Sequence, residues 1–226
     1  MLKSVTVSRE PSGKYYVSLL YEYQTIKPDY EIDPSKAVGL DMSMPNFYVS
    51  SREGRVDTPH AYRKMEDRLA KEQRKLSHMV KGSSNYKKQR LKVAKLHAKT
   101  THQRNDFLHK ASRKLVNNYD IIGIEDLDMQ AMSRSLNYGK SVADKGWGKF
   151  VSMLMYKAKA IGKVAIKVDK LFPSSQTCHE CGCVSKLTKD LSVREWDCPQ
   201  CGAHLYRDNN AAINLEAEAV RIYCTR

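Results

Sequence analysis

Hydrophobic and polar residues recur with clear periods along most of the chain, and these periods predict its secondary structure. Alternating or short apolar runs predict strands, whereas spacings of three, four and seven predict helices. Strands are expected at residues 14–22, 37–41, 47–51, 55–58, 120–125 and 163–168. Helices are expected in both halves of residues 61–118, at 147–161 and at 208–221. Because strands alternate with helices, the pattern predicts an α/β sheet.

The predicted strands are of two kinds. Short turns join residues 37–41, 47–51 and 55–58, which predicts an antiparallel meander. Residues 120–125 form a short apolar run with β-branched side chains, which is typical of a buried central strand. A loop is expected between this strand and the helix that begins near Trp147.

Residues 61–118 predict a helical hairpin. One apolar series comprises Tyr62, Met65, Leu69, Leu76 and Met79, and the second comprises Leu91, Val93, Leu96, Phe107, Leu108 and Leu115. The sequence KGSSN at residues 81–85 marks the turn between the two helices. The apolar stripe is expected to pack, and the opposite face is expected to meet solvent.

Charge changes this picture. The 226 residues include 39 Lys and Arg against 25 Asp and Glu, a net charge of +14, and residues 61–118 hold 17 of the basic residues with only four acids. Such an excess is rare in a metabolic enzyme and typical of a protein that binds a polyanion. The alternative is a solvated charged face. The candidate phosphate contacts are Arg63, Lys64, Lys71, Arg74, Lys75, Lys87, Lys88 and Arg90.

Targeting signals are not evident in the sequence. No run approaches the roughly 18 apolar residues of a membrane span. The first residues alternate polar and apolar side chains, unlike the apolar core of a signal peptide. We therefore expect a soluble, cytoplasmic protein with no membrane partner.

Four of the six cysteines form two pairs near the end of the chain. Cys178 and Cys181 form one pair, Cys198 and Cys201 form the other, and 16 residues separate Cys181 from Cys198. In a reducing compartment this spacing predicts a metal site, and four thiolates suit a closed structural Zn²⁺ site. A single iron ion is the alternative. Cys183 is expected to be a bystander, although it is close enough in sequence to compete with Cys181 as a ligand.

Three acids lie at the ends of predicted elements. Asp41 ends one strand, Glu125 ends the central strand, and Asp208 opens the last helix. Carboxylates that converge in this way can hold two Mg²⁺ ions for phosphodiester hydrolysis. Each acid also has a plainer explanation. Asp41 could cap a turn, Glu125 could mark where a strand reaches water, and Asp208 could be an N-cap.

Together these residues resemble the TnpB (OrfB) family of bacterial and archaeal insertion sequences, the presumed ancestor of type V CRISPR nucleases. The similarity covers residues 1–215 in order. The matching stretches are VGLDMS at 38–43, YRK at 62–64, GIEDL at 123–127, FPSSQTC at 172–178, REWDCPQCG at 194–202 and RDNNAAIN at 207–214.

The resemblance implies a RuvC-like, RNase H-type mixed sheet with the basic hairpin and a zinc ribbon inserted before the last helix. Asp41, Glu125 and Asp208 match the family's catalytic, Mg²⁺-binding acids, and the four cysteines match its zinc ligands. An RNA from the transposon end would guide DNA cleavage, so that base pairing reads the target sequence. The implied domains are a barrel remnant at 1–33, a nuclease core at 34–172, the zinc ribbon at 173–206, and the last helix with the tail at 207–226.

The chain also departs from the family. Most of the N-terminal wedge barrel that holds the guide RNA is missing, so a separate chain could supply that module. Tyr206 stands where the family often has Asp, a change that should spare the metal site. The main rival reading is a DNA- or RNA-binding remnant or regulator of transposition that does not cleave. A zinc-ribbon transcription factor explains the cysteines but not the acids.

Overall fold

The computed structural model describes residues 1–22, 30–43, 45–128, 145–190 and 192–225. Most of the loop expected after residue 125 lies outside the described residues, as does Met44 in the turn after the first strand of the meander. The chain divides into two compact units. One comprises Met1–Lys27 and Pro59–Phe107, and the other comprises Pro28–Thr58 and Leu108–Arg226.

The first unit begins with a β-hairpin. Strands β1 (Leu2–Arg9) and β2 (Tyr15–Tyr21) pair antiparallel, with Val7 opposite Val17. Strand β2 was predicted, but β1 was not. Every residue of both strands is exposed, so neither strand has a buried face. Residues 4–8 do alternate polar and apolar side chains, a strand signal that the sequence analysis used only as evidence against a signal peptide.

The predicted basic helical hairpin is confirmed. Helix α1 (Ala61–Ser77) and helix α2 (Ser84–Asn118) are joined by a turn that starts three residues earlier than expected. A core of Leu69, Val93 and Leu96 holds them together. Beside it, the buried Glu72 accepts hydrogen bonds from Gln89 (2.7 Å) and Lys92 (2.9 Å), which lower the pKa of its carboxyl to about 2.

The second unit is built on a mixed five-stranded sheet in the order β5-β4-β3-β6-β7. Strands β3 (Ala37–Asp41), β4 (Tyr48–Ser50) and β5 (Gly54–Val56) form the predicted antiparallel meander. Strands β6 (Ile121–Glu125) and β7 (Val164–Val168) continue the sheet parallel to β3. All five lie close to their predicted positions, so the α/β prediction is confirmed.

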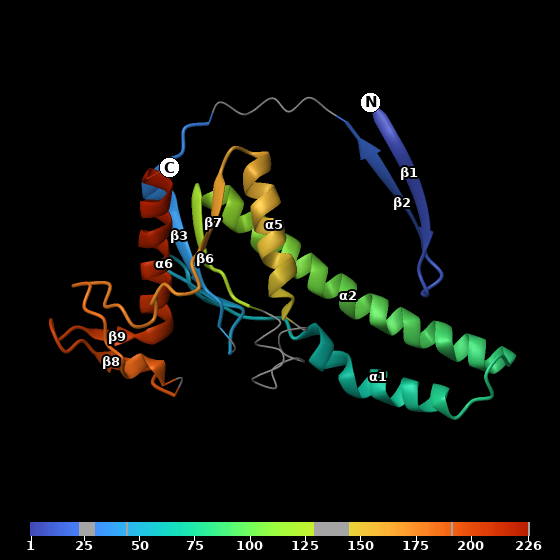
Figure 1. Ribbon diagram of the computed structural model, residues 1–226. Coiled ribbons are helices and arrows are strands. Elements are labelled where there is room, and N and C mark those ends of the chain that lie inside the picture. The colour runs from blue at the N-terminus through green and yellow to red at the C-terminus, as the bar shows by residue number, and fades with distance from the viewer. Residues whose placement is uncertain (23–29, 44, 129–144, 191, 226) are drawn as a thin grey trace. The chain divides into compact units, whose positions relative to one another are not determined.

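Helices cover both faces of this sheet (Figure 1). Helix α6 (Arg207–Cys224) lies on one face, where Leu215 and Ala219 pack against residues of β3, β6 and β7. Helix α5 (Trp147–Ala160) lies on the other face, where Phe150 contacts Phe47 and Tyr48. Helix α5 ends one residue before its predicted end, and α6 begins one residue earlier and ends three residues later than predicted. None of the described helices is long and apolar enough to cross a membrane.

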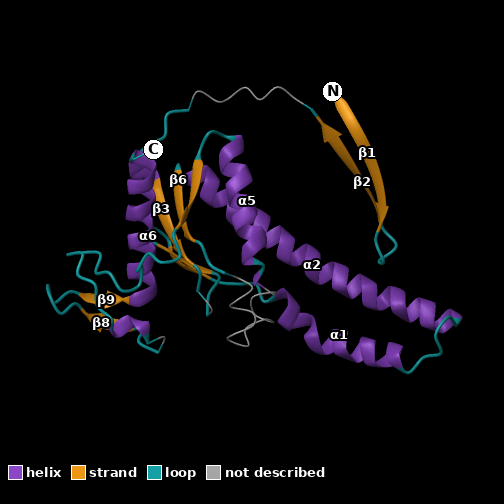
Figure 2. Cartoon of the chain, viewed as in Figure 1, coloured by secondary structure: helices purple, strands orange, loops and turns teal. Residues whose placement is uncertain are grey.

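Residues 173–206, here called the cysteine module, lie between β7 and α6 and are mostly loop (Figure 2). Their regular structure consists of the short antiparallel strands β8 (Glu195–Asp197) and β9 (His204–Tyr206) and the 3-10 turn η2 (Leu187–Lys189). A second 3-10 turn, η1 (Pro34–Lys36), leads into β3. Strand β9 runs directly into α6, so the module and the helix are continuous.

Two glycines allow α6 to lie directly on the sheet. Gly39 of β3 and Gly123 of β6 are paired across the two strands. A Cβ atom at Gly39 would lie 1.9 Å from the backbone oxygen of Ala212, and one at Gly123 would lie 2.4 Å from that of Leu215. Both obstacles are helix backbone, which cannot rotate away as a side chain can. Any larger residue would therefore push α6 off the sheet.

Replacing Gly39 by alanine should destabilise the protein by about 3 kcal/mol or more, because the added methyl group overpacks a rigid contact. Gly148→Ala is the matched control, since nothing lies within 4 Å of a Cβ there and the residue is inside α5. That control should be neutral or stabilising by about 0.5–1 kcal/mol, the helix-propensity difference. Urea unfolding measures both, and equal stabilities for the two variants would contradict this account of α6 packing.

Candidate metal and nucleic-acid sites

The three predicted acids lie around one end of the sheet. Asp41 is the last residue of β3 and Glu125 the last residue of β6. Because β3 and β6 are parallel neighbours, with Leu40 opposite Ile124, their final carboxylates lie at the same edge. Asp208 enters this edge from α6, where it is the second residue. The packing of α6 on Gly39 and Gly123 therefore brings a residue from the end of the chain to two strand ends.

The electrostatics of this edge show that the acids affect one another. Burial raises the pKa of Asp41 to about 8, and the negative charges of Asp208 and Glu125 contribute to this shift. Burial also raises the pKa of Glu125. Among the described residues, the four cysteines form the one group of three or more possible ligands that is close enough to hold a metal ion, and the three acids are not such a group. The acids are thus near enough to affect one another's pKa without forming a closed ligand set.

The plainer explanation for one of the acids is wrong. Asp208 is not the N-cap of α6, because that position is taken by Tyr206, whose side chain makes no capping bond. The alternative for Asp41 stays open, because the turn that follows it includes Met44, which lies outside the described residues. Glu125 is half-buried at its strand end, so the alternative for that residue stays open.

Three polar residues that the sequence analysis did not single out lie beside these acids. The Arg194 guanidinium lies 3.6 Å from the Asp208 carboxylate, and the Ser43 hydroxyl donates to it at 3.4 Å. The positive charge of Arg207 offsets part of the upward pKa shifts of Asp41 and Glu125. Within the described part of the chain, the buried Nη1 of Arg207 has no hydrogen-bond partner. In the sequence, Arg207 belongs to the RDNNAAIN stretch that contains Asp208. Arg194 lies 14 residues before Asp208, at the start of the REWDCPQCG stretch, so its sequence position does not indicate that it approaches Asp208.

The donor set at this edge fits a hard divalent cation. Carboxylate oxygens are the ligands that Mg²⁺ prefers, and Mg²⁺ uses one or two carboxylates together with water or phosphate oxygens. A bound cation would favour the ionised form of Asp41, whose pKa is raised by burial and by the neighbouring carboxylates. The Asp208 side chain is 20% exposed, so this edge of the sheet reaches solvent.

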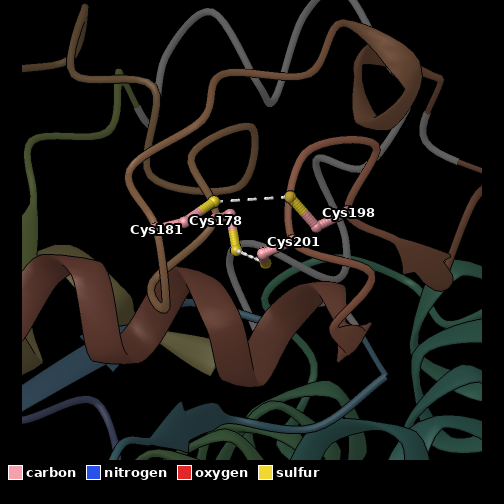
Figure 3. Close-up of side chains that lie close together, drawn as sticks. All are labelled: Cys178, Cys181, Cys198 and Cys201. Atoms are coloured by element: carbon pink, nitrogen blue, oxygen red, sulfur yellow. Dashed lines mark hydrogen bonds between the residues drawn. The ribbon is translucent and has the colours of Figure 1, made fainter.

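The four paired cysteines converge in the cysteine module (Figure 3). The sulfurs of Cys178 and Cys201 lie 3.7 Å apart and those of Cys181 and Cys198 lie 3.5 Å apart, and all four are within 4.8 Å of one another. A tetrahedral ion with bonds of about 2.3 Å to sulfur needs S···S separations of about 3.8 Å. The four cysteines therefore have the geometry to bind a metal such as zinc.

The backbone around the sulfurs supports thiolate. The amides of Gly182 and Gly202 each donate at 2.8 Å to the carbonyl of the cysteine four residues earlier, which closes a tight turn at each cysteine pair. The amide of Cys201, together with that of Gln200, lowers the pKa of the Cys198 thiol to about 6. Cys183 is not one of the four converging sulfurs, as expected for a bystander, and its carbonyl accepts from the Cys178 amide at 2.8 Å.

The predicted phosphate contacts are all solvent-exposed residues of α1 and α2. The structure adds a basic groove in the same unit, of about 740 Å³, between the β1–β2 turn and α2. Its floor includes Gly13, Leu91 and Ala98. The cationic residues that line it were absent from the predicted set: they are Arg9, Lys14, Lys95 and Lys99, with His102 beside them.

Two models of known protein families match the chain. The OrfB_IS605 family model, described as "Probable transposase", matches residues 18–136, which is more than half of the chain. The chain belongs to the OrfB family. A second model, "Cas12f1-like, TNB domain", matches residues 147–215, a range that includes α5, the four cysteines and the start of α6.

Similar curated proteins are longer than this OrfB-family chain. It is 41% identical over 215 residues to a Streptomyces pristinaespiralis protein named "Putative RNA-guided DNA endonuclease", covering 95% of this chain and 52% of that protein. It is 32% identical over 234 residues to the Escherichia coli K12 protein of the same name with the suffix InsQ, covering 96% and 56%. The OrfB-family chain thus spans about half the length of these relatives.

Solved structures show the same fold. A Cas12f1–sgRNA–target DNA complex matches with a TM-score of 0.59 at 18% identity, covering 84% of this chain and 40% of that one. A CRISPR-Cas12f ternary complex matches with a TM-score of 0.56 at 18% identity, covering 90% and 42%. The OrfB-family chain therefore has a Cas12f-like fold with a mixed α/β sheet.

The purified chain should carry one zinc ion, and the paired cysteines should hold it. Cys201→Ser should lose the ion because a closed four-thiolate site needs every ligand. Cys183→Ser and Cys224→Ser should keep it, since neither sulfur belongs to the group of four. Metal analysis of the three variants tests this expectation. Full zinc content in Cys201→Ser, or its loss in Cys183→Ser, would contradict the ligand set.

Proposed function

We propose that the chain contains the nuclease core of an RNA-guided DNA endonuclease, with a RuvC-like, RNase H-type sheet and Mg²⁺-dependent chemistry. The observation that carries the proposal is the approach of Asp41, Glu125 and Asp208 at one sheet edge in an OrfB-family chain. The names of the relatives, which describe RNA-guided DNA endonucleases, support the same activity. Residues 34–172 and 207–226 would form the core, and residues 173–206 a zinc ribbon.

The residues at the sheet edge would divide the work of phosphodiester hydrolysis. Asp41, Glu125 and Asp208 would hold Mg²⁺, which when bound supplies positive charge for the attacking and leaving oxygens. The positive charge of Arg207 offsets part of the rise in pKa that burial causes in Asp41 and Glu125. Its unpartnered Nη1 and the exposed guanidinium of Arg194 are donors of the kind that orient a phosphate.

Nucleic acid would be bound by the first unit of the chain, Met1–Lys27 and Pro59–Phe107, where the exposed basic side chains lie. The eight exposed side chains on α1 and α2 and the cationic groove offer contacts to a phosphate backbone, which carry affinity but no sequence information. Sequence would be read by pairing between a guide RNA and the target strand. One of the two Cas12f structures is a complex with sgRNA and target DNA, and the other is a ternary complex. Both support this assignment of partners.

Replacing any of the three acids by alanine should abolish cleavage while leaving nucleic-acid binding intact, because each removes a metal ligand and not a phosphate contact. Asp126→Ala is the matched control. Asp126 follows Glu125 directly, is exposed and pairs with Lys167 at 2.7 Å. Labelled DNA is incubated with Mg²⁺, with and without transposon-end RNA, and the cut products are measured. Normal cutting by Asp41→Ala or Asp208→Ala would contradict the catalytic assignment.

The lane without RNA separates guided from unguided activity. Cutting that needs the RNA and disappears in Asp208→Ala supports a guided nuclease. Salt-sensitive binding with no cutting under any condition supports the rival function, a nucleic-acid-binding regulator without cleavage. Weak binding that does not depend on salt would contradict both functions, since each requires contact with the phosphate backbone.

The groove should make a measurable share of the phosphate contacts. The double variant Lys95→Ala/Lys99→Ala should weaken RNA binding and lower the slope of log affinity against log salt by about 1–2, or about one per lost contact. Lys36→Ala/Lys170→Ala removes the same charge from the other unit and is the control. Filter binding at several salt concentrations gives both slopes. Equal slopes for the two double variants would contradict a role for the groove.

A further inference from the structure

Two asparagines near the start of α6 are not explained by the proposed chemistry. Asn210 and Asn214 follow Asp208 in the stretch RDNNAAIN, and they are 1% and 7% exposed. They are four residues apart, so they share one side of the helix. Buried amide side chains are costly unless they are hydrogen-bonded, so their partners indicate what they do.

Both asparagines bind the cysteine module. The Asn214 amide donates to the carbonyls of Ser174 (2.8 Å) and Thr177 (2.6 Å). The Asn210 amide donates to the same Thr177 carbonyl at 2.7 Å, and its side-chain oxygen accepts from the His179 amide at 3.0 Å. These contacts surround Cys178, since Thr177 and His179 are its neighbours in the chain. The first metal ligand is thereby fixed to the first two turns of α6.

The same two turns carry Asp208 and are fixed to the sheet. Ala212 lies against Gly39, next to the strand end that carries Asp41. The amide of Arg207 donates at 2.8 Å to the carbonyl of Arg194, which belongs to the cysteine module. The position of Asp208 therefore depends on contacts to both the sheet and the cysteine module.

We propose that Asn210 and Asn214 are positioning residues that couple the four-cysteine site to the carboxylate site. This inference rests on the proposed metal-binding role of Asp41 and Asp208. Metal bound by the cysteines orders the loop around Cys178, and the asparagines hold the start of α6 to that loop. Without the metal the loop loses its order, because a small metal module has too little core to fold alone. The start of α6 then loses two buried anchors, and Asp208 is released from its place opposite Asp41.

A purely structural role would differ in its consequences. If the asparagines only attached the cysteine module to the rest of the protein, their loss would free the module without changing how the carboxylates bind a cation. The two roles are therefore separated by cation binding at the acids, measured without any cleavage reaction. Partners one step removed from a metal site commonly change its affinity by 10–100-fold.

The experiment titrates the full chain with Mn²⁺ as the probe and follows free Mn²⁺ by electron paramagnetic resonance. The carboxylate site is defined as the binding that is lost in Asp208→Ala. Asn210→Ala and Asn214→Ala should each weaken this binding by about 10–100-fold. Asn209→Ala is the control, because Asn209 directly precedes Asn210 on the same helix and is exposed. Zinc analysis and circular dichroism of each variant establish that the cysteine site and the fold are retained.

A second arm needs no variant. Removing zinc from the wild-type chain with a chelator should weaken Mn²⁺ binding at the Asp208-dependent site to a similar extent. In Asn214→Ala protein the same treatment should have little further effect, because coupled changes are not additive.

Each outcome decides between the proposals. Unchanged Mn²⁺ affinity in both asparagine variants, or in zinc-free wild-type protein, would overturn the coupling but leave the proposed function standing. Mn²⁺ binding that is identical in wild-type and Asp208→Ala protein would overturn the carboxylate site itself, and with it both proposals.

Discussion

The contact on which the rest of the second unit depends is the close approach between the backbone of α6 and the sheet. It requires residues without a Cβ atom at two positions that are paired across β3 and β6, and Gly39 and Gly123 supply them. Because interiors are close-packed, a helix that approaches this far is fixed in position to within a fraction of an ångström. The first turn of that helix carries Asp208. The position of an acidic residue is thus set by two glycines more than 80 residues before it in the chain.

The same packing creates an electrostatic cost. It gathers Asp41, Glu125 and Asp208 at one edge, where burial and mutual repulsion raise the pKa of Asp41 to about 8. Stability alone would favour neutral residues at such a place. Arg207 offsets part of the cost, since its charge favours the ionised form of both buried acids. Among the described residues the buried Nη1 of Arg207 has no hydrogen-bond partner, and perturbed carboxyl groups beside such a donor are typical of functional sites.

The sequence predicted the sheet better than it predicted the contacts of the site. Strand β3 was predicted to the residue, since a buried strand is a continuous apolar run with polar residues at its end. Strand β1 was missed although residues 4–8 alternate polar and apolar side chains, because that alternation was interpreted only as evidence against a signal peptide. The three acids could be predicted, since strand and helix ends are visible in the sequence. The N-cap explanation of Asp208 was wrong because α6 starts at Arg207, and Arg194 was missed because its approach to Asp208 depends on how the cysteine module folds.

The two candidate metal sites need opposite properties, and their arrangement reconciles them. The four cysteines form a closed group in which every ligand comes from the protein, so an ion bound there acts as a rigid brace. For the proposed phosphodiester hydrolysis the carboxylate edge would have to admit a phosphate, so it could not hold its own geometry by closure. Helix α6 touches both sites within its first two turns, where Asn210 and Asn214 bind the loop of Cys178 and Asp208 reaches the sheet edge. The closed site can therefore supply the rigidity that the open site lacks, through hydrogen bonds whose partners are fixed backbone carbonyls.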